Sequence, residues 1–268
     1  MREEATRKKR IDCEGRETAW CRLAVLTHQG DRTEQQDSWG WAFKDAETLA
    51  VVCDGMGGLE KGIYASSLTR DYLLETFRDK EGPAALPDLI RALQQADRKL
   101  SEETDRRENP AGVGTTALAV LLIERKLFWC GAGDSRGYLF RRGELIQFTQ
   151  DHNLLAALKE QLQSGLISRE AFERQAAGGE ALISYVGLGK LSLLDYSKKP
   201  FCMEPQDRML LTTDGLYRLV EGDILRSILT EEKDIEKVLW KLEAEADQAA
   251  RRGRIPRDNM TTIVIEIK

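Results

Sequence analysis

The stretch Leu49-Ala-Val-Val-Cys-Asp-Gly-Met-Gly-Gly58 is the most informative part of the sequence. The apolar run up to Cys53 predicts a buried strand, because it is short, continuous and followed by turn residues. The strand ends at Asp54, and the glycines beside this aspartate give the backbone an unusual conformational freedom. One Asp-Gly pair by itself usually marks only a turn. Its significance therefore depends on whether the arrangement recurs.

Further aspartates occupy similar positions at the ends of apolar runs. They are Asp134 after the run 127–133, Asp214 after the run 209–213, Asp258 before the final run 262–267, and Asp37 after the turn 30–36. Neighbouring strand ends would bring these carboxylates together, and such a cluster needs a cation to be stable. Carboxylates, a backbone carbonyl and water are the ligands that Mg²⁺ and Mn²⁺ prefer. The pattern therefore predicts a site for hard divalent ions.

The expected metal site suggests a reaction class. Two ions about 4 Å apart that share one carboxylate can activate a water molecule and neutralise a phosphoryl group. Hydrolysis of a phosphate ester fits this chemistry. Arg32 lies shortly before Asp37, and a guanidinium there could bind a phosphate through two hydrogen bonds. A surface salt bridge is the alternative role for this arginine.

The composition disfavours several classes of protein. The 268 residues include 40 Lys and Arg against 45 Asp and Glu, a net charge of −5, which argues against binding nucleic acid. No apolar run approaches about 18 residues, so we expect no membrane-spanning helix. The five cysteines form no Cys-x-x-Cys pair, which favours reduced thiols and a cytoplasmic location. With only two histidines, a histidine-based zinc site is disfavoured as well.

The order of apolar runs predicts an α+β fold. Clustered runs joined by short hairpins predict strands near 22–27, 39–43, 48–53, 115–123, 127–132, 136–140, 144–149, 209–213 and 262–267. Helical spacing appears at 63–77, from residue 87 onward and at 234–250. Because strands and helices do not alternate regularly, we expect antiparallel sheets flanked by helices instead of a doubly wound parallel sheet. We expect a polar N-terminal tail over 1–20 and a single domain over 21–268, with an inserted helical flap at about 153–200.

Seven short blocks give the sequence a resemblance to a known family. They are Arg32-Thr-Glu-Gln-Gln-Asp37, Asp54-Gly-Met-Gly-Gly58, Gly114-Thr-Thr116, Gly133-Asp-Ser-Arg136, Asp151-His152, Thr213-Asp-Gly-Leu216 and Asp258-Asn-Met-Thr261. With these blocks in order, the sequence resembles the metal-dependent Ser/Thr protein phosphatases of the protein phosphatase 2C (PPM) family, in their compact bacterial form. The resemblance extends from about residue 22 over most of the chain. It implies a sandwich of two antiparallel β-sheets flanked by α-helices.

The resemblance also implies a dinuclear Mn²⁺ or Mg²⁺ site between the sheets. By analogy, Asp54 bridges both ions, Gly55 contributes its carbonyl, and Asp214 and Asp258 complete one coordination shell. Asp134 resembles a ligand of a third, weaker ion, which it would share with Asp214.

The implied activity is hydrolysis of phosphoserine and phosphothreonine in proteins by a water that bridges the metals. Arg32 would bind the substrate phosphate, and Asp37 would hold metal-bound water or orient neighbouring ligands. The expected catalytic residues are therefore Arg32, Asp37, Asp54 and Asp214. Phosphoproteins are the implied substrates, and a cognate Ser/Thr kinase is a reasonable partner.

The sequence departs from the family pattern at three places. Gln36 replaces an acidic residue that often precedes Asp37, which predicts weaker affinity for one metal. Met56 stands where animal members carry a histidine, so the leaving alkoxide would be protonated by a metal-bound water, or not by a side chain at all. In the flap, residues 175–182 replace the His-Pro and Arg-Asn pattern of the family, which leaves the substrate choice open.

Two alternatives to a protein phosphatase remain at this stage. The fold could be a catalytically weak or inactive regulatory or binding module, which the change at Gln36 and the altered flap would favour. It could also be a small-molecule phosphate monoesterase that uses the same metals. Metal-dependent activity on a phosphopeptide and on a metabolite ester separates these possibilities.

Overall fold

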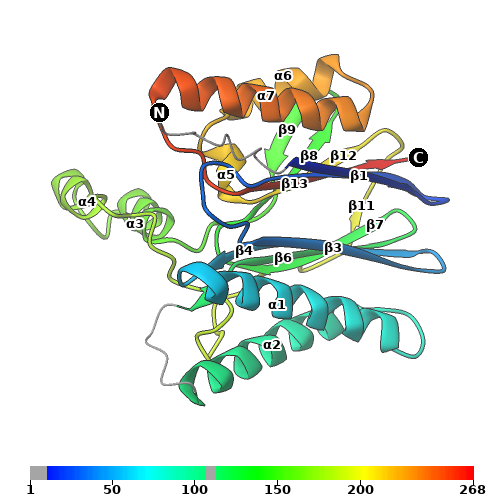
Figure 1. Cartoon of the computed structure of the whole chain (residues 1–268), viewed down its shortest axis with the longest axis horizontal. Coiled ribbons are helices and arrows are strands. Elements are labelled where there is room, and N and C mark those ends of the chain that lie inside the picture. The colour runs from blue at the N-terminus through cyan, green and yellow to red at the C-terminus, as the bar shows by residue number, and fades with distance from the viewer. Residues whose placement is uncertain (1–10, 107–112) are drawn as a thin grey trace, which may run out of the picture.

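A computed structural model describes residues 11–106 and 113–268 of the chain. Two antiparallel sheets lie face to face, with a pair of helices over each outer face (Figure 1). Helices α1 (Leu59–Asp79) and α2 (Leu86–Arg106) cover one sheet, and α6 (Gly222–Glu231) and α7 (Ile235–Gly253) cover the other. The short helix α5 (Asp214–Tyr217) lies near one end of the sheets. The expected α+β sandwich is confirmed.

Every pairing within the two sheets is antiparallel. The first sheet has the order β1 (Ile11–Glu17), β2 (Cys21–His28), β13 (Met260–Ile267), β12 (Arg208–Thr212), β8 (Arg136–Arg141) and β9 (Glu144–Gln147). The second sheet has the order β10 (Asp195–Tyr196), β7 (Lys126–Ala132), β6 (Ala117–Ile123), β4 (Glu47–Met56) and β3 (Asp37–Lys44). Two short strands join it, β5 (Gly114–Thr115) on β4 and β11 (Phe201–Cys202) on β7.

Strand β4 explains why the run Leu49–Cys53 is apolar throughout. Alternate side chains of a strand point to opposite faces of its sheet. Val51 packs in the core beneath α1 and α2, whereas Val52 packs between the two sheets with Leu118 and Ile263. Since both faces are covered, polar residues have no exposed position along this run, and burial of the apolar surface stabilises all three layers.

Two expectations about chain segments need correction. Residues 11–17, expected within the polar tail, form β1, which pairs with β2 over its whole length. This strand lies at the edge of its sheet and is mostly exposed, so its sequence lacks the apolar alternation that marks a strand. Residues 1–10 of the expected tail lie outside the described residues.

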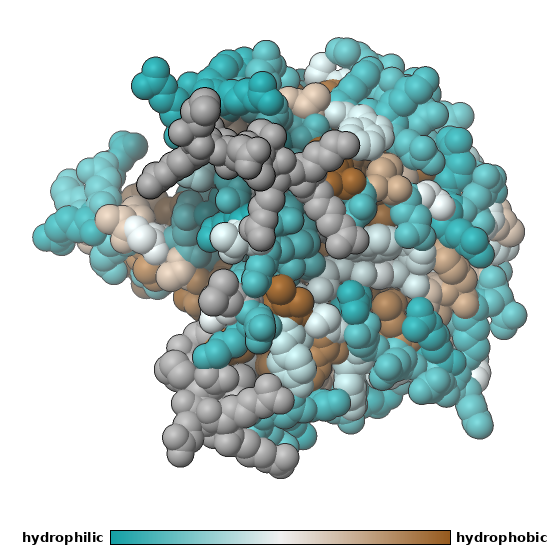
Figure 2. Space-filling model, in the orientation of Figure 1, coloured by the Kyte–Doolittle hydropathy of each residue, from teal (hydrophilic) through white to brown (hydrophobic). Residues whose placement is uncertain are grey.

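The flap is helical only in its first half. Helices α3 (Leu154–Gln163) and α4 (Arg169–Gln175) project from the body of the molecule (Figure 1). The rest of the segment is irregular apart from β10, which extends the second sheet. The face shown in Figure 2 is mainly hydrophilic, with hydrophobic residues gathered on the flap and beside the sheets. Within the described part of the chain, no helix combines the length and apolar character needed to cross a bilayer.

The returning end of the flap is anchored by a buried carboxylate on α2. Asp97 Oδ1 accepts the backbone N–H groups of Gly187 (2.8 Å) and Gly189 (3.0 Å), and Oδ2 accepts that of Leu191 (3.0 Å). Both glycines have positive φ angles, which allow the chain to curl around the carboxylate. Hydrogen bonds to a charged acceptor are stronger than neutral ones, so this contact holds the loop against the helix layer.

Asp97→Ala should lower the free energy of unfolding by about 3 kcal/mol, because three N–H groups lose a charged acceptor. Urea unfolding followed by circular dichroism measures this change. Asp71→Ala, at an exposed position on α1, is the matched control and should change stability by less than about 0.5 kcal/mol. A loss below about 1 kcal/mol for Asp97→Ala would contradict the anchoring role.

Candidate active site

The second sheet brings three of the expected aspartates to one end of the sandwich. Asp37 begins β3 and Asp54 lies near the end of β4, and the two residues are direct partners in the antiparallel ladder. Strand β7 runs parallel to β4, because β6 is antiparallel to both. Asp134, which follows β7, therefore leaves the sheet at the same end.

The first sheet contributes two more aspartates at this end. Asp214 follows β12 and Asp258 precedes β13, and these strands are antiparallel neighbours. Burial raises the pKa of Asp54, and the carboxylates of Asp37, Asp214, Asp134 and Asp258 raise it further. The other four aspartates expected from the sequence thus lie within electrostatic reach of Asp54.

Asp37 is the most enclosed member of the group. Burial raises its pKa to about 8, although hydrogen bonds from Thr213 and Thr261 lower it. Its Oδ2 accepts a hydrogen bond from Thr213 Oγ1 at 2.8 Å, whereas its buried Oδ1 has no protein partner. A buried carboxylate oxygen without a partner is destabilising, so this oxygen favours a bound water or cation.

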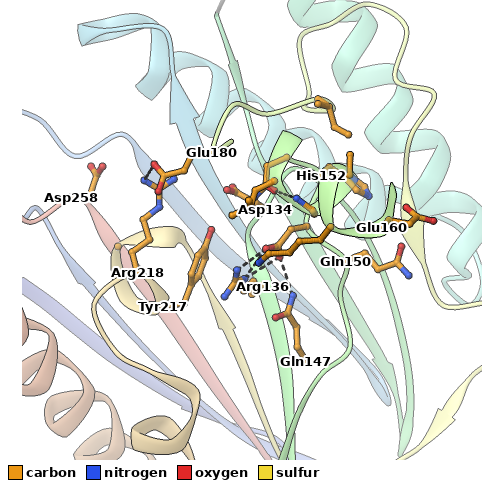
Figure 3. A pocket seen from close by; sticks show the side chains of 18 of the residues that line it. Asp134, Arg136, Gln147, Gln150, His152, Glu160, Glu180, Tyr217, Arg218 and Asp258 are labelled. Carbon is orange, nitrogen blue, oxygen red and sulfur yellow. Dashed lines mark hydrogen bonds and ion pairs between the residues drawn. The ribbon is translucent and has the colours of Figure 1, made fainter. Parts of the chain in front are cut away.

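Two arginines already offset part of the negative charge. Arg32 Nη2 lies 2.5 Å from Asp258 Oδ2, and Arg218 Nε lies 3.0 Å from Asp214 Oδ2. Burial raises the pKa of Asp214 to about 6, while the Arg218 guanidinium lowers it. Arg218 also contacts Glu180 of the flap at 2.8 Å, and thus connects the flap to this aspartate (Figure 3).

The carboxylates fit a hard divalent cation in their chemistry. Within residues 11–106 and 113–268, no three Asp, Glu, His or Cys side chains converge as a preformed ligand set. Two of the candidate ligand oxygens are occupied by arginines instead. Asp258 Oδ2 contacts Arg32, and Asp214 Oδ2 contacts Arg218. The charge, the burial and the free Oδ1 of Asp37 suit a metal, which would compete with the arginines for Asp214 and Asp258.

Glycine permits the close backbone packing beside Asp54. A Cβ on Gly55 would lie 2.1 Å from the carbonyl oxygen of Gly62 in α1 and 2.6 Å from that of Gln36. Only glycine therefore fits where the strand end, helix α1 and the turn before β3 meet. The expected carbonyl ligand, Gly55, lies at the centre of this contact.

Asn259 holds the loop that carries Arg32. Its Nδ2 donates to the carbonyl oxygens of Gln29 (2.8 Å) and Glu34 (2.9 Å), and its Oδ1 accepts the N–H of Gln36 (2.8 Å). These three bonds join the 29–36 loop to the residue after Asp258. The loop and the Asp258 turn therefore form one unit.

A cavity of about 1080 Å³ opens beside the aspartates, between the flap and α5. Asp134 and Asp258 line it (Figure 3). Flap residues such as Leu155 and Ile183 line it as well. A cavity of this size next to a charged cluster is the expected form of a substrate site.

Comparison with known proteins shows where this architecture occurs. The sequence profile of the family described as Protein phosphatase 2C matches residues 20–156, just over half of the chain. The chain belongs to the protein phosphatase 2C family. The family and the enzyme class predicted from the sequence, a protein-serine/threonine phosphatase, are thereby confirmed.

Relatives of this protein phosphatase 2C chain match most of its length. Serine/threonine phosphatase stp of Listeria welshimeri is 27% identical over 242 residues, which cover 88% of this chain and 91% of the relative. The crystal structure of PstP from Mycobacterium tuberculosis superposes with a TM-score of 0.76 at 26% identity, covering 93% of this chain and 99% of PstP. A structure of the PstP catalytic domain in complex with two manganese ions gives a TM-score of 0.75 at 26% identity, over 92% and 98% of the chains.

Several residues at the protein phosphatase 2C site were not anticipated. Arg218 and Glu180 carry no motif signal, although Arg218 stands one turn of helix after Asp214. Arg136, within a recognised block, forms an ion pair with Asp151 at 2.6 Å and lies 3.7 Å from the Tyr217 ring. This ion pair connects the block 133–136 to the block 151–152, a contact that the sequence did not predict.

Both histidines of this phosphatase have structural contacts. Burial lowers the pKa of His152, and the neutral ring accepts the backbone N–H of Gly133 through Nδ1 at 3.3 Å. His28 Nδ1 accepts the N–H of Gly30 at 2.8 Å. His152 therefore stabilises the turn beside Asp134, and His28 stabilises the turn that leads to Arg32.

Gly55→Ala should reduce the free energy of unfolding by about 3 kcal/mol or more, because the new methyl group would overlap two backbone carbonyls. Thermal and urea unfolding of the purified protein test this. Gly222→Ala is the control, since a Cβ there meets no atom within 4 Å. It should leave stability within about 0.5 kcal/mol of the wild type. Equal stabilities of the two variants would refute the packing argument.

Proposed function

We propose that this chain hydrolyses phosphoserine and phosphothreonine in proteins, using two Mn²⁺ or Mg²⁺ ions at the end of the sandwich. The observation that carries the proposal is the convergence of Asp37, Asp54, Asp134, Asp214 and Asp258 from both sheets. The related PstP catalytic domain, described in complex with two manganese ions, supports the same chemistry here.

In the proposed site, Asp54 and the Gly55 carbonyl would hold the two ions. Asp214 and Asp258 would also hold one of them, in place of their contacts with Arg218 and Arg32. Asp134 and Asp214 would hold a third, weaker ion. When bound, two such ions supply an activated water nucleophile and neutralise the charge of the phosphoryl group.

The remaining residues position the reactants. Arg32 has a largely exposed side chain at the mouth of the site, and its guanidinium can exchange Asp258 for the substrate phosphate. Asp37, held by Thr213, orients water and the neighbouring carboxylates. The water oxygen bonds to phosphorus as the bond to the serine or threonine oxygen breaks. Since Met56 carries no proton to donate, the proton that the attacking water gives up would reach the departing alkoxide through solvent water.

The cavity beside the aspartates favours a polypeptide over a small metabolite. It is open along the flap and combines apolar side chains, such as Leu155 and Ile183, with charged ones such as Lys159 and Glu160. Such a mixed surface can contact residues on either side of a phosphorylated serine or threonine. A Ser/Thr kinase would be the enzyme that supplies this substrate.

Hydrolysis of para-nitrophenyl phosphate, a phosphothreonine peptide and a phosphorylated sugar should be compared with Mn²⁺, with Mg²⁺ and with excess EDTA. We expect metal-dependent turnover, with the peptide preferred over the sugar phosphate. Asp54→Asn and Asp214→Asn should reduce turnover by at least about a hundredfold, because each loses a charged metal ligand, while the far-ultraviolet circular dichroism spectrum stays unchanged.

The outcomes separate the possible functions. Wild-type rates in either variant would refute the assignment of that aspartate. Metal binding without turnover of any substrate would favour a regulatory or binding module. Preference for the sugar phosphate would favour a small-molecule phosphate monoesterase.

Arg32→Ala should raise KM for the phosphopeptide by about 30-fold, equivalent to about 2 kcal/mol, because a charge-assisted contact with the phosphate is lost. Steady-state kinetics with Mn²⁺ measure the change. Arg226→Ala, which removes an exposed arginine on α6, is the matched control and should keep the wild-type KM. Unchanged KM and kcat in Arg32→Ala would exclude Arg32 from the site.

A further inference from the structure

We propose that Thr116 is a positioning residue for the metal site. Its side-chain hydroxyl fixes the strand end that carries Asp54 and joins it to the turn that carries Asp134. The inference rests on the proposed function, since it concerns the aspartates assigned to the ions. Thr116 itself is almost completely buried between β5 and β6, so its role is exerted through its neighbours.

In the hydrogen-bond ladder of β4, a side-chain oxygen takes the place of a backbone carbonyl as the acceptor at Asp54. Val52 pairs with Leu118 and Gly55 with Thr115, so the same register places Asp54 opposite Thr116. In a regular antiparallel pair, two such residues can exchange both backbone hydrogen bonds. Here the Thr116 N–H donates to the Asp54 carbonyl at 2.8 Å, but the Asp54 N–H donates to Thr116 Oγ1 at 2.9 Å.

The Thr116 carbonyl has a different partner. It accepts a hydrogen bond from Thr115 Oγ1 at 2.8 Å, and the same hydroxyl lies 2.9 Å from the Asp54 carbonyl. A side chain therefore completes the pairing at Asp54, where a backbone carbonyl would ordinarily do so. Without this hydroxyl, the Asp54 N–H would lose its acceptor inside the protein.

A second observation links Thr116 to the neighbouring aspartate. Thr116 Oγ1 lies 2.7 Å from Ser135 Oγ, directly beside Asp134 in the chain. Gly133 packs against the same threonine, because a Cβ on this glycine would lie 2.6 Å from Thr116 Cγ2. One buried side chain therefore contacts both strand ends, and its hydroxyl sets the distance between the residues that carry the carboxylates.

This arrangement predicts a specific requirement for a hydroxyl. Valine has the shape of threonine but cannot accept the Asp54 N–H or bond to Ser135. Serine keeps both hydrogen bonds and loses only the methyl group that faces Gly133. A purely structural role in packing would rank valine above serine, whereas a positioning role reverses this order.

Calorimetric titration of the full chain with Mn²⁺ tests the proposal. Thr116→Val should weaken Mn²⁺ binding about tenfold or more, as is typical when a partner that orients metal ligands is lost. Thr116→Ser should stay within about threefold of the wild type. Thr69→Val is the matched control, because Thr69 is fully buried in α1 and its hydroxyl has no partner. It should bind Mn²⁺ like the wild type.

Circular dichroism in EDTA establishes that each variant is folded. If Thr116→Val does not fold, Ser135→Ala takes its place, because it removes the link to Asp134 and leaves the Asp54 N–H bonded to Thr116. A severalfold loss of Mn²⁺ affinity is then expected. Wild-type affinity in folded Thr116→Val, or in Ser135→Ala, would overturn the inference. Absence of Mn²⁺ binding by the wild type would instead refute the proposed metal site, and the inference with it.

Discussion

The mutual repulsion of buried carboxylates is the constraint on which the rest of the site depends. Asp37 and Asp54 face each other across one ladder, and Asp214 lies close enough to raise the pKa of both. Such a group is stable only when cations lie beside it or when some of its members bind protons, as their raised pKa values indicate. Arg32 and Arg218 supply this positive charge in the structure. A bound metal ion would replace them beside the carboxylates that they contact.

The two-sheet architecture keeps these charges together. Each sheet supplies part of the cluster, and the core between the sheets, which includes Val52 and Ile263, sets their separation. Hydroxyl groups then connect the layers, as Thr213, the residue after β12, does when it donates to Asp37 of the second sheet. The positions of the aspartates are consequently defined by packing far from the charged atoms.

Much of this arrangement could be predicted from the sequence because strand ends are local features. The aspartates near the end of β4 and after β7 and β12 follow clear apolar runs, and antiparallel pairing gathers them at one end. Strand β1 escaped prediction because an exposed edge strand shows no alternation of polar and apolar residues. The partnership of Arg218 with Glu180, and of Thr116 with Ser135, depends on tertiary contacts between segments that no local pattern connects.

The place of β13 in the first sheet has a consequence for the order of folding. This strand, residues 260–267, lies between β2 and β12 and pairs with both along most of its length. During synthesis, one edge of β2 and one edge of β12 therefore lack their strand partner until residue 267 has left the ribosome. Closure joins segments more than two hundred residues apart, which is slow in folding and exposes the nascent chain to aggregation.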